Sequence, residues 1–149
     1  MVKPAEAKEL HLLLFSFLGI FHKKFLLPLR RRYDYCLPLK KNQGKVLHVL
    51  YQFDRLTPTE LSKMLDIEKG SLTTVVNRLV EMGMVTRSSD PTDRRRVLLS
   101  LSSRGREKME RVMQKHLHHL MHIFRDVEQE DMERFFANLR NTVEFMKKL

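Results

Sequence analysis

Residues 66–101 read DIEKGSLTTVVNRLVEMGMVTRSSDPTDRRRVLLSL, and this stretch decides the fold. Its first half places apolar residues on one side of a helix. These are Leu72, Val75, Val76, Leu79 and Val80. Apolar residues that recur three and four positions apart line one face of an α-helix. We therefore expect a helix that packs against a core here and leaves its other face exposed.

The other face of this helix carries short or forked hydrogen-bonding groups. They are Ser71, Thr73, Thr74, Asn77 and Arg78, with Lys69 adding charge at the start. A solvated helix face usually carries pairs of Glu and Lys instead, and this run contains no acid. Ser, Thr and Asn side chains can bond base edges or phosphates in a major groove. The pattern predicts a helix that reads DNA, with a merely solvated face as the alternative.

A hairpin is predicted directly after this helix. Gly83 ends the helix, and two strand-like runs follow at residues 84–88 and 97–101. The turn-forming residues 90–93, Asp-Pro-Thr-Asp, separate the two runs. A helix with a polar face followed by a hairpin favours a DNA-binding unit.

The tip of this hairpin is basic. Arg94, Arg95 and Arg96 are consecutive, and on a projecting loop they can reach phosphates or enter a narrow minor groove. We expect Arg94 and Arg96 to point differently from Arg95, because side chains alternate near a strand. Asp93 is unusual at a DNA-binding tip, so we expect it to orient an arginine. The alternative is a solvated run of charge.

The whole composition agrees with a DNA partner. The chain has 149 residues, of which 42% are hydrophobic, and a formal net charge of +10. Such an excess favours a polyanion, either nucleic acid or an anionic membrane surface. Cys36 is the single cysteine, which excludes an intramolecular disulfide and fits a reducing, cytoplasmic location. No Gly-rich phosphate loop, nucleophile elbow or other enzyme motif stands out, so we expect neither catalysis nor a cofactor.

The N-terminal part is predicted to be one apolar helix at residues 5–27. It ends or kinks at Pro28, and an irregular basic link follows at residues 30–38. The helix is apolar on nearly all sides, so it needs cover on nearly all sides. Its uninterrupted apolar run is shorter than the roughly 20 residues that a bilayer span needs. We expect a second subunit to cover it, and no membrane.

The remaining segments predict a mainly α protein with a small β-hairpin. Helices are expected at residues 42–53, 58–65, 102–125 and 128–147, and Thr57-Pro58-Thr59-Glu60 has the form of a capping box. The helix at 58–65 and the reading helix form a helix-turn-helix. We expect three regions: 1–38 and 103–149 for dimerisation, and 39–102 for DNA binding.

Residues 43–105 resemble the MarR (multiple antibiotic resistance regulator) family of winged-helix transcription regulators. The matching pieces are Gln43 with Val46-Leu47, the run from Leu56 to Ser62, the run from Leu72 to Leu79, Gly83 to Arg87, and Asp90 to Arg96 with Leu101 to Gly105. The most specific piece is the family's D-x-R wing, followed by a strand that ends in L-T-x-x-G. Asp93 and Arg95 occupy the D and R, and Ser102 stands where threonine is usual.

The resemblance implies a homodimer built from the first helix and the last two helices, which form a dimerisation layer. It implies that Arg95 enters the minor groove, while the Ser71–Arg78 face reads the major groove of a pseudo-palindromic operator. It also implies a repressor released by a small aromatic or anionic ligand. Candidate residues for the ligand cleft are Phe17, Phe21, His48 and Tyr51, and plain core packing is the alternative for each.

Two other signals stay open as alternatives. Redox sensing would use Cys36, close to Arg30–Arg32, which can lower a thiol pKa. Metal sensing would use the cluster His116, His118, His119 and His122, in which the His118/His122 spacing suits one metal ion. No third ligand is evident, so we expect no metal site. Outside this class, the chain could be a basic membrane-surface or interaction protein, or a non-specific architectural DNA binder.

Overall fold

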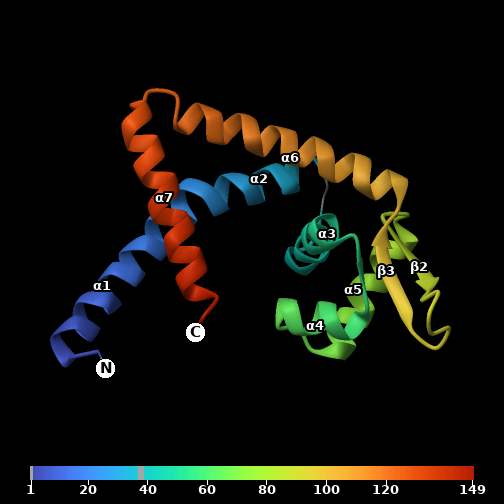
Figure 1. Ribbon diagram of the computed structural model, residues 1–149. Coiled ribbons are helices and arrows are strands. Elements are labelled where there is room, and N and C mark those ends of the chain that lie inside the picture. The colour runs from blue at the N-terminus through green and yellow to red at the C-terminus, as the bar shows by residue number, and fades with distance from the viewer. Residues whose placement is uncertain (1, 37–38) are drawn as a thin grey trace. The chain divides into compact units, whose positions relative to one another are not determined.

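The computed structural model describes residues 2–36 and 39–149, with side chains placed for residues 2–31 and 39–149. It is mainly helical with one small antiparallel sheet (Figure 1). The chain divides into two compact units, Met1–His116 and Leu117–Leu149. The three functional regions expected from the sequence concern what each part does, and they stay a prediction.

The N-terminal helix continues past the proline that was expected to stop or kink it. It runs as α1, Pro4–Phe21, a π-helical turn, His22–Leu26, and α2, Leu27–Cys36. In the wide turn the Leu27 N–H bonds to the His22 carbonyl five residues earlier. This turn stands next to Pro28, where a regular helical hydrogen bond cannot form. The irregular link predicted at residues 30–38 is therefore wrong as far as Cys36, whose side chain lies outside the described part.

The first helix exposes its apolar side chains. None of the residues in α1 is buried, and Leu13, Phe15 and Leu18 are about 60% exposed. Residues Pro4–Arg31 are also long and apolar enough to cross a membrane, by length and composition alone. The uninterrupted apolar run is short, as expected, but the helix that contains it is long enough for a span. Exposed apolar surface of this extent calls for a covering partner.

The core of the first unit lies under a helix-turn-helix. This part comprises α3, Lys41–Phe53, α4, Pro58–Leu65, and α5, Lys69–Glu81. The buried residues of these helices lie at the apolar positions that the sequence pattern predicted. The largest fully buried side chains are Leu47, Leu50, Leu61, Leu72, Leu79, Met84, Leu99 and Met109. Burying one such leucine contributes about 2 kcal/mol, so this core fixes how α5 presents its polar face.

The start of α4 and the end of α5 both have defined caps. The Thr57 hydroxyl accepts a hydrogen bond from the Glu60 N–H at 3.2 Å, and the Glu60 carboxylate accepts one from the Thr57 N–H at 2.7 Å, so the predicted capping box is confirmed. Gly83 adopts φ +69° after α5. The Gly83 N–H donates to the Val80 carbonyl, and the Met84 N–H donates to the Leu79 carbonyl. These two hydrogen bonds form a Schellman motif.

The sheet has three strands rather than the two of the predicted hairpin. β2, Val85–Ser89, and β3, Val97–Leu101, pair in the expected antiparallel manner. A third strand, β1, Arg55–Leu56, pairs with the other edge of β3 and gives the order β1-β3-β2. Two residues are too few for an alternating pattern, so no sequence signal marked β1. The extra strand ties the base of the hairpin to the corner between α3 and α4.

The second unit contains the end of α6, Ser103–Ile123, and α7, Gln129–Met146. Phe124 and Phe135 pack with their ring centroids 5.7 Å apart. No residue of α7 is buried. Its apolar side chains are at least 38% exposed at Phe135, Phe136, Leu139, Val143, Phe145 and Met146. The face predicted to be internal thus lies open in a single chain.

Candidate DNA-binding surface

The structure places the predicted reading face of α5 in solvent. Lys69, Ser71, Thr73, Thr74, Asn77 and Arg78 are all exposed, whereas Leu72, Val76 and Leu79 are buried on the opposite side. The alternation follows directly from the helical period of the sequence. The helix therefore offers a continuous polar face that is free to meet another molecule.

Two threonines on this face have committed hydroxyl protons. The Thr73 hydroxyl donates to the Lys69 carbonyl at 2.9 Å, and the Thr74 hydroxyl donates to the Gly70 carbonyl at 3.2 Å. Each oxygen keeps acceptor capacity and each side chain keeps its methyl group. The two threonines can therefore accept a hydrogen bond from a base or contact a thymine methyl.

Asn77 and Arg78 differ in their partners. The Arg87 guanidinium on β2 donates through Nη2 to the Asn77 Oδ1 atom. Arg78 forms an exposed ion pair with Glu81, with Nη1 and Oε2 3.0 Å apart. Exposed pairs of this kind contribute about 0–1 kcal/mol, so the pair leaves Arg78 available to a phosphate. Arg87 was absent from the predicted set, since a lone arginine in a strand carries no motif.

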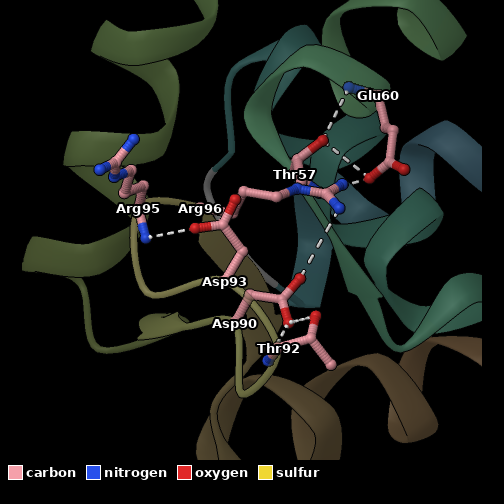
Figure 2. Close-up of polar contacts among 7 residues, drawn as sticks. All are labelled: Thr57, Glu60, Asp90, Thr92, Asp93, Arg95 and Arg96. Carbon is pink, nitrogen blue, oxygen red and sulfur yellow. Dashed lines mark hydrogen bonds and ion pairs between the residues drawn. The ribbon is translucent and has the colours of Figure 1, made fainter.

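The hairpin tip is a tight turn with two arginines at its centre. The Arg96 N–H bonds to the Asp93 carbonyl at 2.9 Å, which makes Arg94 and Arg95 the central residues of the turn. Asp93 accepts the Arg95 backbone N–H at 3.0 Å through Oδ1. Asp93 thus shapes the backbone of the turn rather than holding a guanidinium. Figure 2 shows the Arg95 side chain pointing away from that of Arg96; the turn, rather than strand alternation, is the reason.

Arg96 is directed toward the body of the unit. Its guanidinium lies 3.8 Å from the Asp90 carboxylate and beside the capped end of α4 (Figure 2). The Glu60 pKa is lowered, first by the Thr57 N–H, then by the Thr57 hydroxyl, with a smaller contribution from Arg96. A hollow of about 440 Å³ lies between this end of α4 and the tip, lined by Thr57, Pro58, Thr59, Glu60, Lys63, Arg95, Arg96 and Val97. Arg96 therefore braces the tip, and Arg94 and Arg95 project from it.

A family comparison accounts for this arrangement. Residues 39–97, which include the helix-turn-helix and most of the hairpin, match the MarR family. This region of the chain therefore matches the MarR family, and MarR proteins are among the relatives and solved structures to which the chain is similar. MarR of Escherichia coli is 39% identical over 69 residues, which are 46% of this chain and 48% of that protein. The aligned part thus spans about half the length of this curated relative.

The structures of MarR proteins share the fold. The Multiple Antibiotic Resistance Repressor MarR aligns with a TM-score of 0.71 and 26% identity, over 87% of this chain and 94% of that one. A mutant MarR from E. coli complexed with operator DNA aligns with a TM-score of 0.60 and 25% identity, over 87% and 94% of the two chains. The winged helix-turn-helix fold expected from the sequence is confirmed.

The four candidate ligand residues lie in two pairs. Phe17 and Phe21 stack on α1 with ring centroids 5.6 Å apart. His48 and Tyr51 are half-buried on α3. Burial lowers the His48 pKa, which favours the neutral imidazole. The assignment of a ligand cleft to these four residues stays a prediction.

The histidine and cysteine candidates have no further support from the geometry. His118 and His122 are exposed on α6. In residues 2–31 and 39–149, no group of three or more His, Cys, Asp or Glu side chains could hold a metal ion. Cys36 lies outside the described side chains. Metal and redox sensing therefore stay alternatives to release by a small organic ligand.

We predict that acid loosens the hairpin tip. The Thr92 hydroxyl and the Thr92 N–H, with smaller contributions from Arg96 and the Asp93 N–H, lower the Asp90 pKa. A lowered pKa gives stability that is present above the unfolded value and lost as the pH falls through the folded one. We expect the Thr92 amide resonance to report this transition in an NMR titration below the ordinary aspartate range. Asp90→Asn should abolish it; an unchanged titration in that variant would contradict the assignment.

Proposed function

We propose that this protein is a homodimeric, sequence-specific DNA-binding transcriptional regulator of the cytoplasm, and that it represses its genes until a small ligand releases it. The observation that carries the proposal is the pairing of the exposed hydrogen-bonding side chains of Ser71–Arg78 on α5, which include no acid, with a tip that projects Arg94 and Arg95. The operator complex of the E. coli MarR mutant, which shares the fold, supports DNA as the partner.

The exposed apolar helices support the homodimer. α1 and α7 bury no residue within one chain, whereas stable interfaces bury about 800 Å² on each partner. One reading helix covers one half-site, so a two-fold dimer would read a pseudo-palindrome. The dimer would also set the spacing of its two reading heads. A ligand that favours one spacing over the other would shift the affinity for DNA.

Selection from random duplex DNA tests the proposed function. The purified full-length protein is incubated with a randomised duplex library at several salt concentrations, and the bound sequences are read. We expect enrichment of an inverted repeat with half-sites about one helical turn apart. Enrichment without any sequence preference would favour an architectural DNA binder, and no binding at all would remove the proposal.

We predict that Leu18→Glu converts the dimer to a monomer. Leu18 is 57% exposed on α1, and a charge placed in an apolar interface costs several kcal/mol. Sedimentation at micromolar concentration should show a dimer for the wild type and for Lys8→Glu, a charge change at an exposed polar position of the same helix. A wild-type monomer that floats with anionic phospholipid vesicles would favour the membrane-surface alternative, to which the length of this helix lends weight.

The ligand response has its own test. A complex with the selected duplex is titrated with benzoate as a simple aromatic anion, with zinc, and with peroxide. Release by benzoate would support the ligand cleft, and its loss in Phe21→Ala would place the ligand there. Release by zinc or by peroxide would instead favour the alternatives at His118 and His122 or at Cys36. A reporter gene behind the selected site distinguishes repression from activation.

A further inference from the structure

We propose that Arg87 fixes the Asn77 side chain as a hydrogen-bond donor toward the DNA, so that Asn77 selects guanine or thymine rather than adenine at one operator position. The inference rests on the proposed function and adds to it a residue that determines specificity. It is carried by the contact between the Arg87 guanidinium on β2 and the Asn77 amide on α5.

The contact sets the orientation of the amide without ambiguity. An asparagine amide can usually be turned by 180°, because its oxygen and nitrogen have similar shapes. A guanidinium has five donors and no acceptor. The atom of Asn77 that faces Arg87 must therefore be Oδ1. The Nδ2 group then points to the other side of the side chain, with protons that no described hydrogen bond uses.

The position of Asn77 makes this orientation relevant to DNA. Asn77 is exposed, three and four positions after Thr74 and Thr73 on the same face of α5. Arg87 is also exposed, and it comes from β2, which packs along α5 in the same unit (Figure 1). The residue that orients the amide therefore belongs to the paired strands of the hairpin, where Arg87 lies opposite Leu99, rather than to its tip.

An amide fixed in this way has a restricted choice of base. Recognition of adenine by asparagine is bidentate: Oδ1 accepts from N6, and Nδ2 donates to N7. Arg87 occupies one acceptor position of Oδ1 and turns this atom toward β2, so Nδ2 is the group that the amide directs away from β2. Guanine presents two adjacent acceptors to this donor, O6 and N7, and thymine presents O4, whereas adenine presents N7 beside the N6 donor, which the amide then no longer pairs. Cytosine presents a donor and is disfavoured.

The neighbouring threonines present hydrogen-bond acceptors to the groove instead of donors. The hydroxyl protons of Thr73 and Thr74 are bonded to backbone carbonyls within the helix. They therefore meet the groove as acceptors and methyl groups, whereas Asn77 meets it as a donor. The face of α5 thus has a defined order of donors and acceptors, and the Asn77 part of this order depends on a residue in the hairpin.

The test compares base preference in three forms of the full-length protein. Sequences are selected from the random library with wild type, Arg87→Met and Arg87→Lys, and the enriched duplexes are varied one base pair at a time. Methionine has similar length and no donor, so the amide is released. Lysine restores both the charge and a donor. We expect the wild type to prefer guanine or thymine over adenine by roughly tenfold at one position of each half-site.

Each outcome decides the proposal. Arg87→Met should accept adenine at that one position about as well as guanine or thymine, with the other positions unchanged, and Arg87→Lys should keep the wild-type preference. A uniform loss of affinity in Arg87→Met with the same base preference would mean that Arg87 only binds phosphate, and it would overturn the inference. Wild-type protein without any sequence preference would overturn the proposed function as well. Thermal unfolding of both variants, monitored by circular dichroism, confirms that they are folded.

Discussion

Gly105→Ala is expected to destabilise the protein by about 3 kcal/mol, near the upper end for overpacking in a core. A Cβ atom at this buried position would lie 2.1 Å from the Met84 carbonyl oxygen and 3.0 Å from its carbon. These are backbone atoms and cannot rotate away. The same carbonyl accepts the Ser102 N–H at 3.0 Å. Displacing it would therefore break a hydrogen bond at the start of α6, and urea unfolding at fixed protein concentration measures the loss.

Gly44→Ala is the matched control for this substitution. Gly44 lies within α3, and a Cβ atom there meets nothing within 4 Å. Replacing glycine by alanine in an open helical position should raise the stability by about 0.5–1 kcal/mol. Equal effects of the two substitutions would contradict the packing argument. The contrast separates the close approach of α6 to Met84 from the general cost of glycine in a helix.

The reason for Gly105 shows what the sequence could and could not predict. The L-T-x-x-G pattern of the wing identified the position, but the cause is a contact between two segments distant in the chain. Ser102, in place of the usual threonine, bonds the Gly83 carbonyl at 2.6 Å and accepts the Gly105 N–H at 2.9 Å. The hydroxyl cap was predictable from local chemistry. Its second bond, to the end of α5, was not.

Local rules also failed where a neighbouring element changed the outcome. Pro28 was expected to stop or kink the first helix, and it does not stop it: a π-helical turn precedes the proline, and the helix continues to Cys36. β1 was missed because its two residues are a strand only through pairing with β3. At the reading face the helical period was sufficient, since exposure depends only on which side of α5 packs. The donor from Arg87 to Asn77 required the tertiary structure, because ten residues separate them.

Arg95→Ala is expected to weaken binding to the selected duplex by about 1–3 kcal/mol per half-site. Arg95 is a central residue of the tip turn. Its side chain points away from that of Arg96, which lies beside α4 (Figure 2). Its guanidinium is therefore free to reach the minor groove, where negative potential is concentrated. Loss of each arginine should also reduce the slope of log affinity against log salt by about one. Binding isotherms at several salt concentrations measure both quantities.

Three further variants separate insertion from charge. Arg95→Lys keeps the charge without the planar fork, so it should preserve the salt slope while losing part of the affinity. Arg111→Ala removes an exposed arginine of α6 that pairs with Glu107, and it should change binding by less than about 0.5 kcal/mol, as exposed charges usually do. A larger loss for Arg94→Ala than for Arg95→Ala would transfer the insertion to Arg94.

Asp93 shapes the tip turn through the backbone of Arg95. Asp93→Ala should therefore weaken binding to the duplex, even though the carboxylate itself repels phosphate. Stronger binding in that variant would contradict the structural role of Asp93.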